Sequence, residues 1–495
     1  MTPVRCTLTD GRVVELEAEP VGTGGEKRVF LSRDRQLAVG FYHGRMADRR
    51  ERVDRLTRIL TTYNPTLAEG TGDYWAQAFC WPVGMVDGER AIPRAFAQAN
   101  HLVWPPLGVV TPAYRAGFYF TDRFGQRQEK EVRWFTGGKA GRFVPRDEAG
   151  SFLTRLQVAV RLARAVRRLH MAGLAHADLS HKNVLVDLRG GDACIIDIDS
   201  LVVPGIAPPA VLGTPGYIAP EVLAGGAQPS IATDRHALAV LLYELLLQRH
   251  PLQGRRVHST RSAEEDERLS MGARALFVEH PTDRSNPPVA PLDRRYGTLG
   301  PALAQCVERT FVEGLHSPGR RADAADWERA LYRTLQWLAP GSAGGWMLAI
   351  PGAPAQGWPA TDAVPDTLLV ARLLRDTGQG LVDEGDHQVL FHHLLLHDWH
   401  LRVGVAPDER ADRAPRAYVS QHQGKWWLVN TAATPWRVTV PGGGAASVAG
   451  RNGMVELVPG TRIRVGEDVP ARVLELQRVD TRTGHALAAP AALAR

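Results

Sequence analysis

The chain has few cysteines and no long apolar runs. Only four cysteines occur among its 495 residues, and they lie far apart, at Cys6, Cys80, Cys194 and Cys306. This spacing forms neither a disulfide framework nor a zinc-binding pattern. The sequence also lacks an N-terminal apolar signal segment and any apolar stretch long enough to cross a membrane. We therefore expect a cytoplasmic protein that makes no use of a membrane.

A strong excess of one charge is also absent. The formal net charge of +6 is small for a chain of this length, so charge alone gives no reason to expect a nucleic-acid partner. The arginines between residues 155 and 168 have the spacing of a solvated helix face. The length is sufficient for two or three hydrophobic cores.

Two aspartates and an asparagine carry the clearest chemical signal. Asp178 and Asn183 belong to the polar segment His176–Asn183, and Asp197 follows a short apolar run. Phosphoryl transfer from ATP needs a carboxylate that orients the attacking hydroxyl and accepts its proton. It also needs an amide oxygen and a second carboxylate that hold Mg²⁺. The spacing of these three residues therefore favours phosphoryl transfer.

The surrounding pattern supports this interpretation. Apolar residues at helical spacing predict a helix over 153–169, with Gly173 as its stop signal. Two apolar β-runs, at 184–186 and 194–196, flank a predicted turn at 189–192. The predicted order is thus a helix, a polar loop, a hairpin and an aspartate.

This order resembles the catalytic core of eukaryotic-type (Hanks-type) serine/threonine protein kinases. The family pattern H-R-D-L-x-x-x-N, followed by D-F-G, matches His176 to Asn183 and then Asp197. The resemblance implies an α+β, bilobal protein-kinase-like fold over residues 1–339, with lobes of about 1–121 and 122–339. It also implies ATP and Mg²⁺ as cofactors, Asp178 as catalytic base, and Asn183 and Asp197 as metal ligands.

Further kinase-like motifs follow in the expected order. The segment 213–221 resembles the G-T-x-x-Y-x-A-P-E that ends the kinase activation segment, and Asp234 precedes an apolar helix. The segment 317–327 resembles the R-x-x-x-x-x-W signature of the same fold. In the family the arginine pairs with the A-P-E glutamate. We therefore expect Arg321 to pair with Glu221, and we assign structural roles to Glu221, Arg321 and Asp234.

The N-terminal lobe departs from the family pattern. Gly22, Gly24 and Gly25 resemble the glycine-rich loop that binds phosphates, but Lys27 stands at the third glycine position. The usual ATP-binding lysine would fall on Gly40. With-no-lysine kinases show the same exchange, so the resemblance implies that Lys27 binds the phosphates. The alternative is a pseudokinase that has lost its lysine and signals by its conformation.

Other departures leave alternatives open. Asp199, within Asp197-Ile198-Asp199, is either an additional metal ligand or a cap of the following turn. Lys182 either replaces the lysine that follows the catalytic aspartate or does not. Ala177 stands where the family has arginine, which argues against activation by a phosphate on the activation segment. Glu51 lies opposite the apolar stripe of a predicted helix over 46–61, so we expect it to be solvated.

The C-terminal third has a different pattern. Gly and Pro are frequent over 340–365, which predicts a linker, and short β-like runs over 366–480 predict an all-β sandwich before a tail at 481–495. Residues 426–430 and 455–466 resemble parts of a forkhead-associated domain. The Arg and Ser expected for binding phosphothreonine are not in place, so a scaffolding or autoinhibitory sandwich is an equal alternative.

One internal segment bears on partners. Residues 275–288 resemble an insert of bacterial kinases that are associated with von Willebrand factor A proteins and metal-dependent phosphatases in tellurite-resistance-type systems. The resemblance implies such partners in addition to the protein substrate. The segment could equally brace the helical lobe. A small-molecule kinase of the aminoglycoside type is a third alternative, which the Glu221 and Arg321 motifs oppose.

Overall fold

The computed structural model describes residues 3–209, 213–341, 344–358, 363–408, 410–443 and 447–487. It divides into two units. The first contains Met1–Gly150 and Thr154–Arg329, and the second contains Ser151–Leu153 and Ala330–Arg495. Helices dominate most of the first unit and antiparallel strands dominate the second. The predicted α+β class, with a β-rich C-terminal region, is confirmed.

The first unit begins with a five-stranded antiparallel sheet in the order β3-β4-β5-β7-β6. Side chains of β5 alternate between its two faces. Val39 and Phe41 pack with Phe30 on one face, in a core shared with the β1–β2 hairpin. The strands of this region are β1 (Val4–Thr7), β2 (Val13–Leu16), β3 (Gly22–Thr23), β4 (Lys27–Leu31), β5 (Leu37–Tyr42), β6 (Gly84–Asp87) and β7 (Leu107–Pro112).

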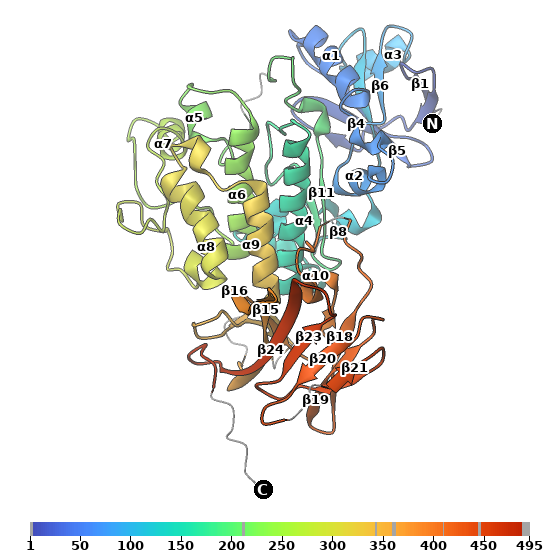
Figure 1. The fold of residues 1–495 in the computed structure, drawn as a ribbon. Helices are drawn as coiled ribbons and strands as arrows, with labels where there is room; N and C mark the ends of the chain where they lie inside the picture. The colour runs from blue at the N-terminus through green and yellow to red at the C-terminus, as the bar shows by residue number, and fades with distance from the viewer. Residues whose placement is uncertain are drawn as a thin grey trace. The chain divides into compact units, whose positions relative to one another are not determined.

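Helix α1 (Arg49–Leu60) packs on the other face of this sheet. Its Leu56 is fully buried in a cluster with Tyr42 of β5, and Val53 and Leu60 are partly buried beside them. The predicted apolar stripe therefore faces the sheet. The shorter helices α2 (Gly72–Ala78) and α3 (Arg94–Ala99) complete this part of the chain, which is blue in Figure 1.

A mostly helical lobe follows, and the predicted lobe boundary at residue 121 coincides with the end of β8. Helix α4 covers the predicted helix over 153–169, and Gly173 ends the turn after it with a φ of 74°. Helix α6 is apolar on nearly all sides and is buried along most of its length, as expected for a central helix. No helix in the described ranges is both long and apolar enough to span a bilayer. The elements are β8 (Tyr119–Thr121), β9 (Arg127–Glu129), α4 (Phe152–Met171), β10 (Val184–Asp187), β11 (Asp192–Ile195), α5 (Pro220–Leu223), α6 (Ile231–Leu247), α7 (Ala263–Met271), α8 (Pro301–Glu308) and α9 (Ala324–Gln336).

A buried ion pair joins α5 to the segment before α9. The side chain of Arg321 is fully enclosed. Its two terminal nitrogens donate to the carboxylate oxygens of Glu221 at 2.8 and 2.7 Å. The guanidinium also donates to the carbonyls of Gly314, Ala232 and Leu315, so its donors are satisfied. The arrangement is that of a structural cross-link.

Two antiparallel sheets form most of the second unit. One has the order β16-β15-β24-β23-β20-β21 and the other β17-β18-β19-β22. Trp436 and Ile463 of the first sheet share one apolar core with Val419 and Leu428 of the second, which is a sandwich. Its elements are β15 (Thr367–Asp376), β16 (Leu381–Leu390), β17 (Leu395–Leu396), α10 (Asp398–Leu401), β18 (Ala417–His422), β19 (Lys425–Asn430), β20 (Trp436–Thr439), β21 (Ser447–Ala449), β22 (Met454–Glu456), β23 (Arg462–Val465) and β24 (Ala471–Asp480).

The predicted linker over 340–365 is wrong for most of its described residues. The strands β12 (Leu338–Pro340), β13 (Trp346–Leu348) and β14 (Gln356–Trp358) pair as a three-stranded antiparallel sheet. Ala339, the predicted end of the kinase domain, is buried with Val370 in the core of the second unit. Residues 342–343 and 359–362 of the predicted linker lie outside the described residues.

The predicted tail at 481–495 also begins too early. Thr481 is buried, and Val479 forms a β-bridge with Ala486. Residues 481–487 therefore belong to the sandwich, while 488–495 lie outside the described residues.

We expect Glu221→Ala to destabilise the protein by about 3–5 kcal/mol, because it leaves the Arg321 charge buried without its counter-ion. Urea denaturation measures the change. The matched control is Arg33→Ala, which breaks the ion pair with Glu15, where both side chains are at least half exposed. The control should cost less than about 1 kcal/mol. Equal costs for the two variants would contradict this role.

Candidate functional site

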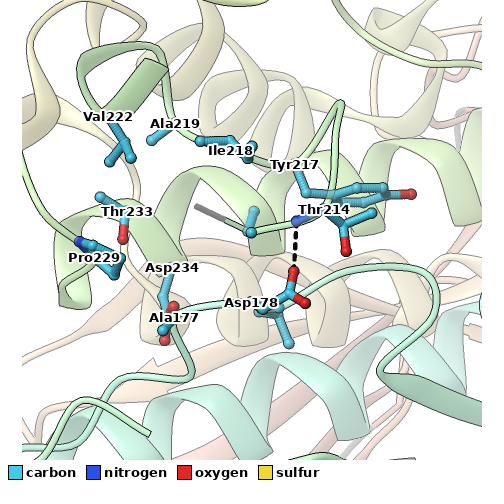
Figure 2. Close-up of a pocket in the computed structure, with 13 residues that line it drawn as sticks. Ala177, Asp178, Thr214, Tyr217, Ile218, Ala219, Val222, Pro229, Thr233 and Asp234 are labelled. Carbon is cyan, nitrogen blue, oxygen red and sulfur yellow. Dashed lines mark hydrogen bonds between the residues drawn. The ribbon is translucent and has the colours of Figure 1, made fainter. Parts of the chain in front are cut away.

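The segment His176–Asn183 holds the side chain of Asp178 through hydrogen bonds. Asn183 Nδ2 donates to the Asp178 carbonyl at 2.8 Å and to Asp178 Oδ2 at 3.0 Å. The backbone N–H of Thr214 donates to Asp178 Oδ1 at 2.7 Å, as Figure 2 shows. Both carboxylate oxygens are thus oriented by uncharged donors. This geometry suits a group that receives a proton from a positioned hydroxyl.

Helix α6 fixes the beginning of the same segment. Asp234 is buried, and its Oδ2 accepts the backbone N–H of His176 at 2.7 Å and lies 3.2 Å from His170 Nε2. Ala177 has a left-handed φ of 67°, which costs a non-glycine residue about 1–2 kcal/mol. The bonds on both sides of Ala177 maintain this conformation. Asp234 therefore links helix α6 to the start of the segment His176–Asn183, and its structural role stays a prediction.

The β10–β11 hairpin brings the metal-ligand candidates together. Asn183 precedes β10 and Ile196 follows β11, and the N–H of Ile196 donates to the Asn183 carbonyl at 3.0 Å. The Ile196 carbonyl lies 2.8 Å from His176 Nε2. Asp197 comes next and has a left-handed backbone, with φ 63° and ψ 44°. Asn183 and Asp197 thus lie at the same end of the hairpin.

The N-terminal sheet places Lys27 beside Gly40. In the β4–β5 pair, Lys27 is opposite Tyr42, and Val29 is opposite Gly40. These positions share one face of the sheet, because opposite residues and residues two apart point the same way. A Cβ atom added at Gly40 would lie 3.5 Å from Cδ of Lys27. The Lys27 stem therefore occupies the space that a lysine at position 40 would enter.

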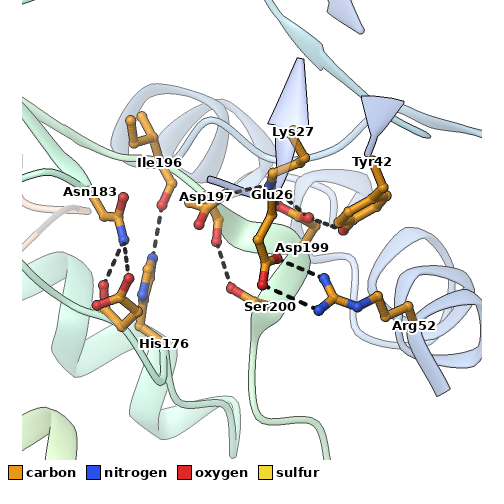
Figure 3. A network of polar contacts seen from close by, with 11 residues as sticks. Glu26, Lys27, Tyr42, Arg52, His176, Asn183, Ile196, Asp197, Asp199 and Ser200 are labelled. Carbon is orange, nitrogen blue, oxygen red and sulfur yellow. Dashed lines mark hydrogen bonds and ion pairs between the residues drawn. The ribbon is translucent and has the colours of Figure 1, made fainter. Parts of the chain in front are cut away.

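The Lys27 ammonium lies between two carboxylates. Its Nζ is 2.5 Å from Asp197 Oδ1 and 2.6 and 2.8 Å from the two oxygens of Asp199 (Figure 3). The Tyr42 hydroxyl donates a further hydrogen bond to Asp199 Oδ2. The sequence leaves Asp199 as a metal ligand or a cap of the following turn. Its carboxylate bonds to Lys27 and Tyr42 of the N-terminal sheet, and its role toward a metal stays a prediction.

Charge and burial act against each other at these groups. Burial lowers the pKa of Lys27, but the carboxylates of Asp197 and Asp199 outweigh it and hold this pKa well above its usual value. Burial raises the pKa of Asp199, yet Lys27 and the hydrogen bond from Tyr42 bring it down to about 2. Desolvation raises the pKa of Asp197, and the neighbouring Asp199 carboxylate adds to the shift. Asp199 is therefore a firmly ionised partner of Lys27.

The glycine-rich segment forms an open turn between β3 and β4. Gly22, Gly24 and Gly25 are all exposed, and a Cβ atom at Gly22 or Gly25 would meet nothing within 4 Å. The Gly24 N–H donates to the Lys27 carbonyl at 2.8 Å. Packing therefore does not require glycine at positions 22 and 25. Close approach of a ligand to the backbone is a reason that fits the exposure.

The remaining candidates lie at the edge of this site. Lys182 is exposed, and its backbone N–H lies 3.4 Å from Ser180 Oγ. Glu51 is exposed on α1, as the sequence predicts. Sequence reasoning missed Tyr42, which reaches Asp199. The available signal was its position two residues after Gly40, on the same face of β5.

A small pocket opens beside Asp178 (Figure 2). Its wall includes Thr214 and Tyr217 of the segment 213–221 and Val222 of α5. The Tyr217 hydroxyl donates to Glu244 of α6. This hydrogen bond ties the wall of the pocket to the central helix.

The oxygen donors at this site fit Mg²⁺. Asn183 uses its amide nitrogen on Asp178, so its amide oxygen is the atom suited to a metal. The Asp197 side chain is 35% exposed, whereas that of Asp199 is 5% exposed. Within the described ranges, no cluster of three His, Cys, Asp or Glu side chains forms a metal site. A magnesium ion held by Asn183 and Asp197 would therefore complete its shell with phosphate oxygens and water.

Asp178, Asn183 and Asp197 lie in a segment that is similar to known proteins. Residues 146–293 match the protein kinase domain family. The match contains Asp178, Asn183, Asp197 and Glu221, whereas Lys27 lies before it. The helical lobe is thus similar to a protein kinase domain in sequence as well as in the order of its elements.

Several known kinases resemble part of the chain. A serine/threonine-protein kinase of Streptomyces coelicolor is 35% identical over 108 residues, which are 20% of this chain and 26% of that protein. A dual serine/threonine and tyrosine protein kinase of Apis mellifera is 34% identical over 95 residues, or 19% of this chain and 10% of that protein. The chain thus aligns with about a quarter or less of these two relatives. The similarities are therefore to protein kinases and cover about a fifth of this chain.

Among solved structures, the rhoptry antigen kinase domain of Toxoplasma gondii is similar at a TM-score of 0.39 and 14% identity. The alignment covers 68% of this chain and 86% of that chain.

Glu244 gives a pH prediction. Burial raises its pKa to about 7, against the opposing effect of the hydrogen bond from Tyr217. Because this pKa is higher in the folded than in the unfolded state, the stabilising effect of the proton is complete below about pH 4.3 and is lost as the pH rises to about 7. Glutamine does not titrate. The unfolding free energy of the wild type minus that of Glu244→Gln should therefore fall between about pH 5 and pH 8. If urea denaturation gives the same difference in unfolding free energy at every pH, the raised pKa of Glu244 is contradicted.

Proposed function

We propose that the chain is an ATP- and Mg²⁺-dependent protein serine/threonine kinase that transfers the γ-phosphoryl group to a protein hydroxyl. The observation that carries the proposal is the Lys27 ammonium at 2.5 Å from Asp197, next to the hairpin end that bears Asn183. A cation, a pair of oxygen ligands and a carboxylate base are the groups that this reaction uses.

Each group has a separate task in the proposed reaction. Bound Mg²⁺ would neutralise the charge on the phosphates, with Asn183 and Asp197 as its protein ligands. Lys27 would hold phosphate oxygens by charge-assisted hydrogen bonds, and the exposed backbone of the turn at Gly25 would face them. Asp178 would orient the substrate hydroxyl and accept its proton.

The pseudokinase alternative rests on Gly40 and Ala177. The Lys27 side chain occupies the space beside Gly40, which supports relocation of the lysine over its loss. Ala177 gives the alternative no further support, because the bonds on both sides of it orient Asp178 without an arginine. The absence of that arginine still favours activity that is independent of activation-segment phosphorylation.

The partners follow from sequence resemblance and stay a prediction. A von Willebrand factor A protein and a metal-dependent phosphatase are expected from residues 275–288. In this segment Asn286 is buried and donates to the carbonyls of Leu252 and Leu276, and buried Glu279 pairs with Arg249. These polar groups brace the helical lobe. The proposed role of the sandwich, whether forkhead-associated-like or not, is regulation or interaction in the cytoplasm.

Asp178→Asn tests the proposed function. The variant should bind ATP like the wild type, but phosphoryl transfer should fall by about 10²–10⁴-fold, the usual contribution of a general base. Autophosphorylation with labelled ATP measures transfer, and calorimetry measures binding. The control Asp147→Asn changes an exposed carboxylate of the same unit and should leave both unchanged. Equal transfer in the wild type and Asp178→Asn would rule out the catalytic role.

Lys27→Ala tests the relocated lysine. It should cost about 1.5–3 kcal/mol of activation free energy, as expected for a lost charge-assisted contact, and thus lower kcat/KM roughly tenfold or more. The double variant Lys27→Gly with Gly40→Lys should recover part of the activity, because the lysine stem would enter the same space from β5. An inactive scaffold predicts no effect of either change.

A further inference from the structure

The site described above does not yet include a carboxylate that positions Lys27. Protein kinases place their ATP-binding lysine with a glutamate from the N-lobe helix. The carboxylates of α1 here are Glu51 and Asp54, and both are exposed. Asp54 lies 3.4 Å from Arg58 of the same helix. Helix α1 therefore presents no carboxylate to Lys27.

Helix α1 instead directs arginines toward its surroundings. Arg52 bonds to Glu26 of the glycine-rich turn at 2.8 Å. Arg55 donates to the Ala207 carbonyl at 2.8 Å, and Arg58 donates to the Pro204 carbonyl at 3.1 Å. The helix is thus attached to the turn and to the segment after Asp199, but not to the lysine.

Asp199 has the contacts that a lysine partner requires. Both of its oxygens lie within 2.8 Å of Lys27 Nζ, and the Tyr42 hydroxyl donates to one of them (Figure 3). Its side chain is 5% exposed, against 35% for Asp197. Both oxygens of Asp199 bond to the sheet, whereas Asp197 bonds to Lys27 through Oδ1. The two aspartates therefore have different tasks.

We propose that Asp199, oriented by Tyr42, is the positioning residue that holds Lys27 at the phosphate site in place of a carboxylate from α1. The inference rests on the proposed kinase function. It implies that the position of the lysine follows the segment 197–200 and does not depend on α1.

Chemical labelling of Lys27 tests the contact without any nucleotide. The full-length protein is treated with an amine-reactive anhydride, and the modification of Lys27 is followed by mass spectrometry relative to exposed Lys139. Asp199→Asn should speed the labelling of Lys27 severalfold, because it frees the ammonium from a buried partner. The matched control Glu51→Gln should leave it unchanged. Equal labelling in the wild type and Asp199→Asn, or faster labelling in Glu51→Gln, would overturn the proposal.

Kinetics separate positioning from metal binding. Asp199→Asn should lower kcat/KM for ATP roughly tenfold or more, since the lysine contact is lost with it. It should cause no further loss when Lys27 is already alanine. Excess Mg²⁺ should not restore activity. Restoration by Mg²⁺, or an additional loss in the Lys27→Ala background, would make Asp199 a metal ligand and overturn the proposal.

Tyr42→Phe replaces Asp199→Asn as the test variant if Asp199→Asn does not fold. It removes only the hydroxyl that orients Asp199, and it should change labelling and kcat/KM in the same direction but by less. Unchanged values in that variant would overturn the proposal. If the wild type transfers no phosphoryl group, the proposed function fails, while the labelling experiment still decides whether Asp199 holds Lys27.

Discussion

The ion pair of Lys27 with Asp197 and Asp199 is the interaction on which the site depends. Two carboxylates two residues apart repel each other, and removing any of these charges from water costs several kcal/mol. The ammonium between them lowers both costs. It also joins the N-terminal sheet to the segment 197–199, because its contacts span 170 and 172 residues of sequence. One ammonium against two carboxylates leaves a net negative charge, which favours a divalent cation on the more exposed Asp197.

The location of the lysine follows from the geometry of an antiparallel sheet. Residues on neighbouring strands that share a face are close enough for a long side chain to reach over its neighbour. Lys27 and Gly40 are related in this way, so either strand can deliver an ammonium to the same space. A Cβ atom at position 40 would touch the Lys27 stem at an ordinary contact distance of 3.5 Å, so a longer side chain there would compete with it. Lys27 at the third glycine position and Gly40 at the usual lysine position are therefore two parts of one structural arrangement.

Much of the helical lobe and the sandwich could be predicted from the sequence because its signals are local. The hairpin between Asn183 and Asp197 sets their spacing, and the region 366–480, predicted to contain short β-runs, includes β18 and β19. The partner of Lys27 could not be predicted, since no local pattern links β4 to Asp199. The linker prediction failed because short strands between tight turns, such as β13, contain or adjoin many Gly and Pro residues. The strands β15 and β16 were not identified, although β15 supplies buried residues to both cores of the second unit.

Helix α1 carries arginines near the site, where protein kinases have a glutamate that pairs with the ATP-binding lysine. The Arg52 guanidinium lies 5.0 Å from the centre of the Tyr42 ring, and the Lys27 ammonium lies 5.6 Å from it. The ring thus has two cations near it, while its hydroxyl donates to Asp199. A carboxylate at position 52 would attract Lys27 toward the helix and away from the metal-binding segment. Arg52 instead pairs with Glu26 of the glycine-rich turn. Helix α1 is therefore attached to the glycine-rich turn, while Lys27 bonds to the segment 197–200.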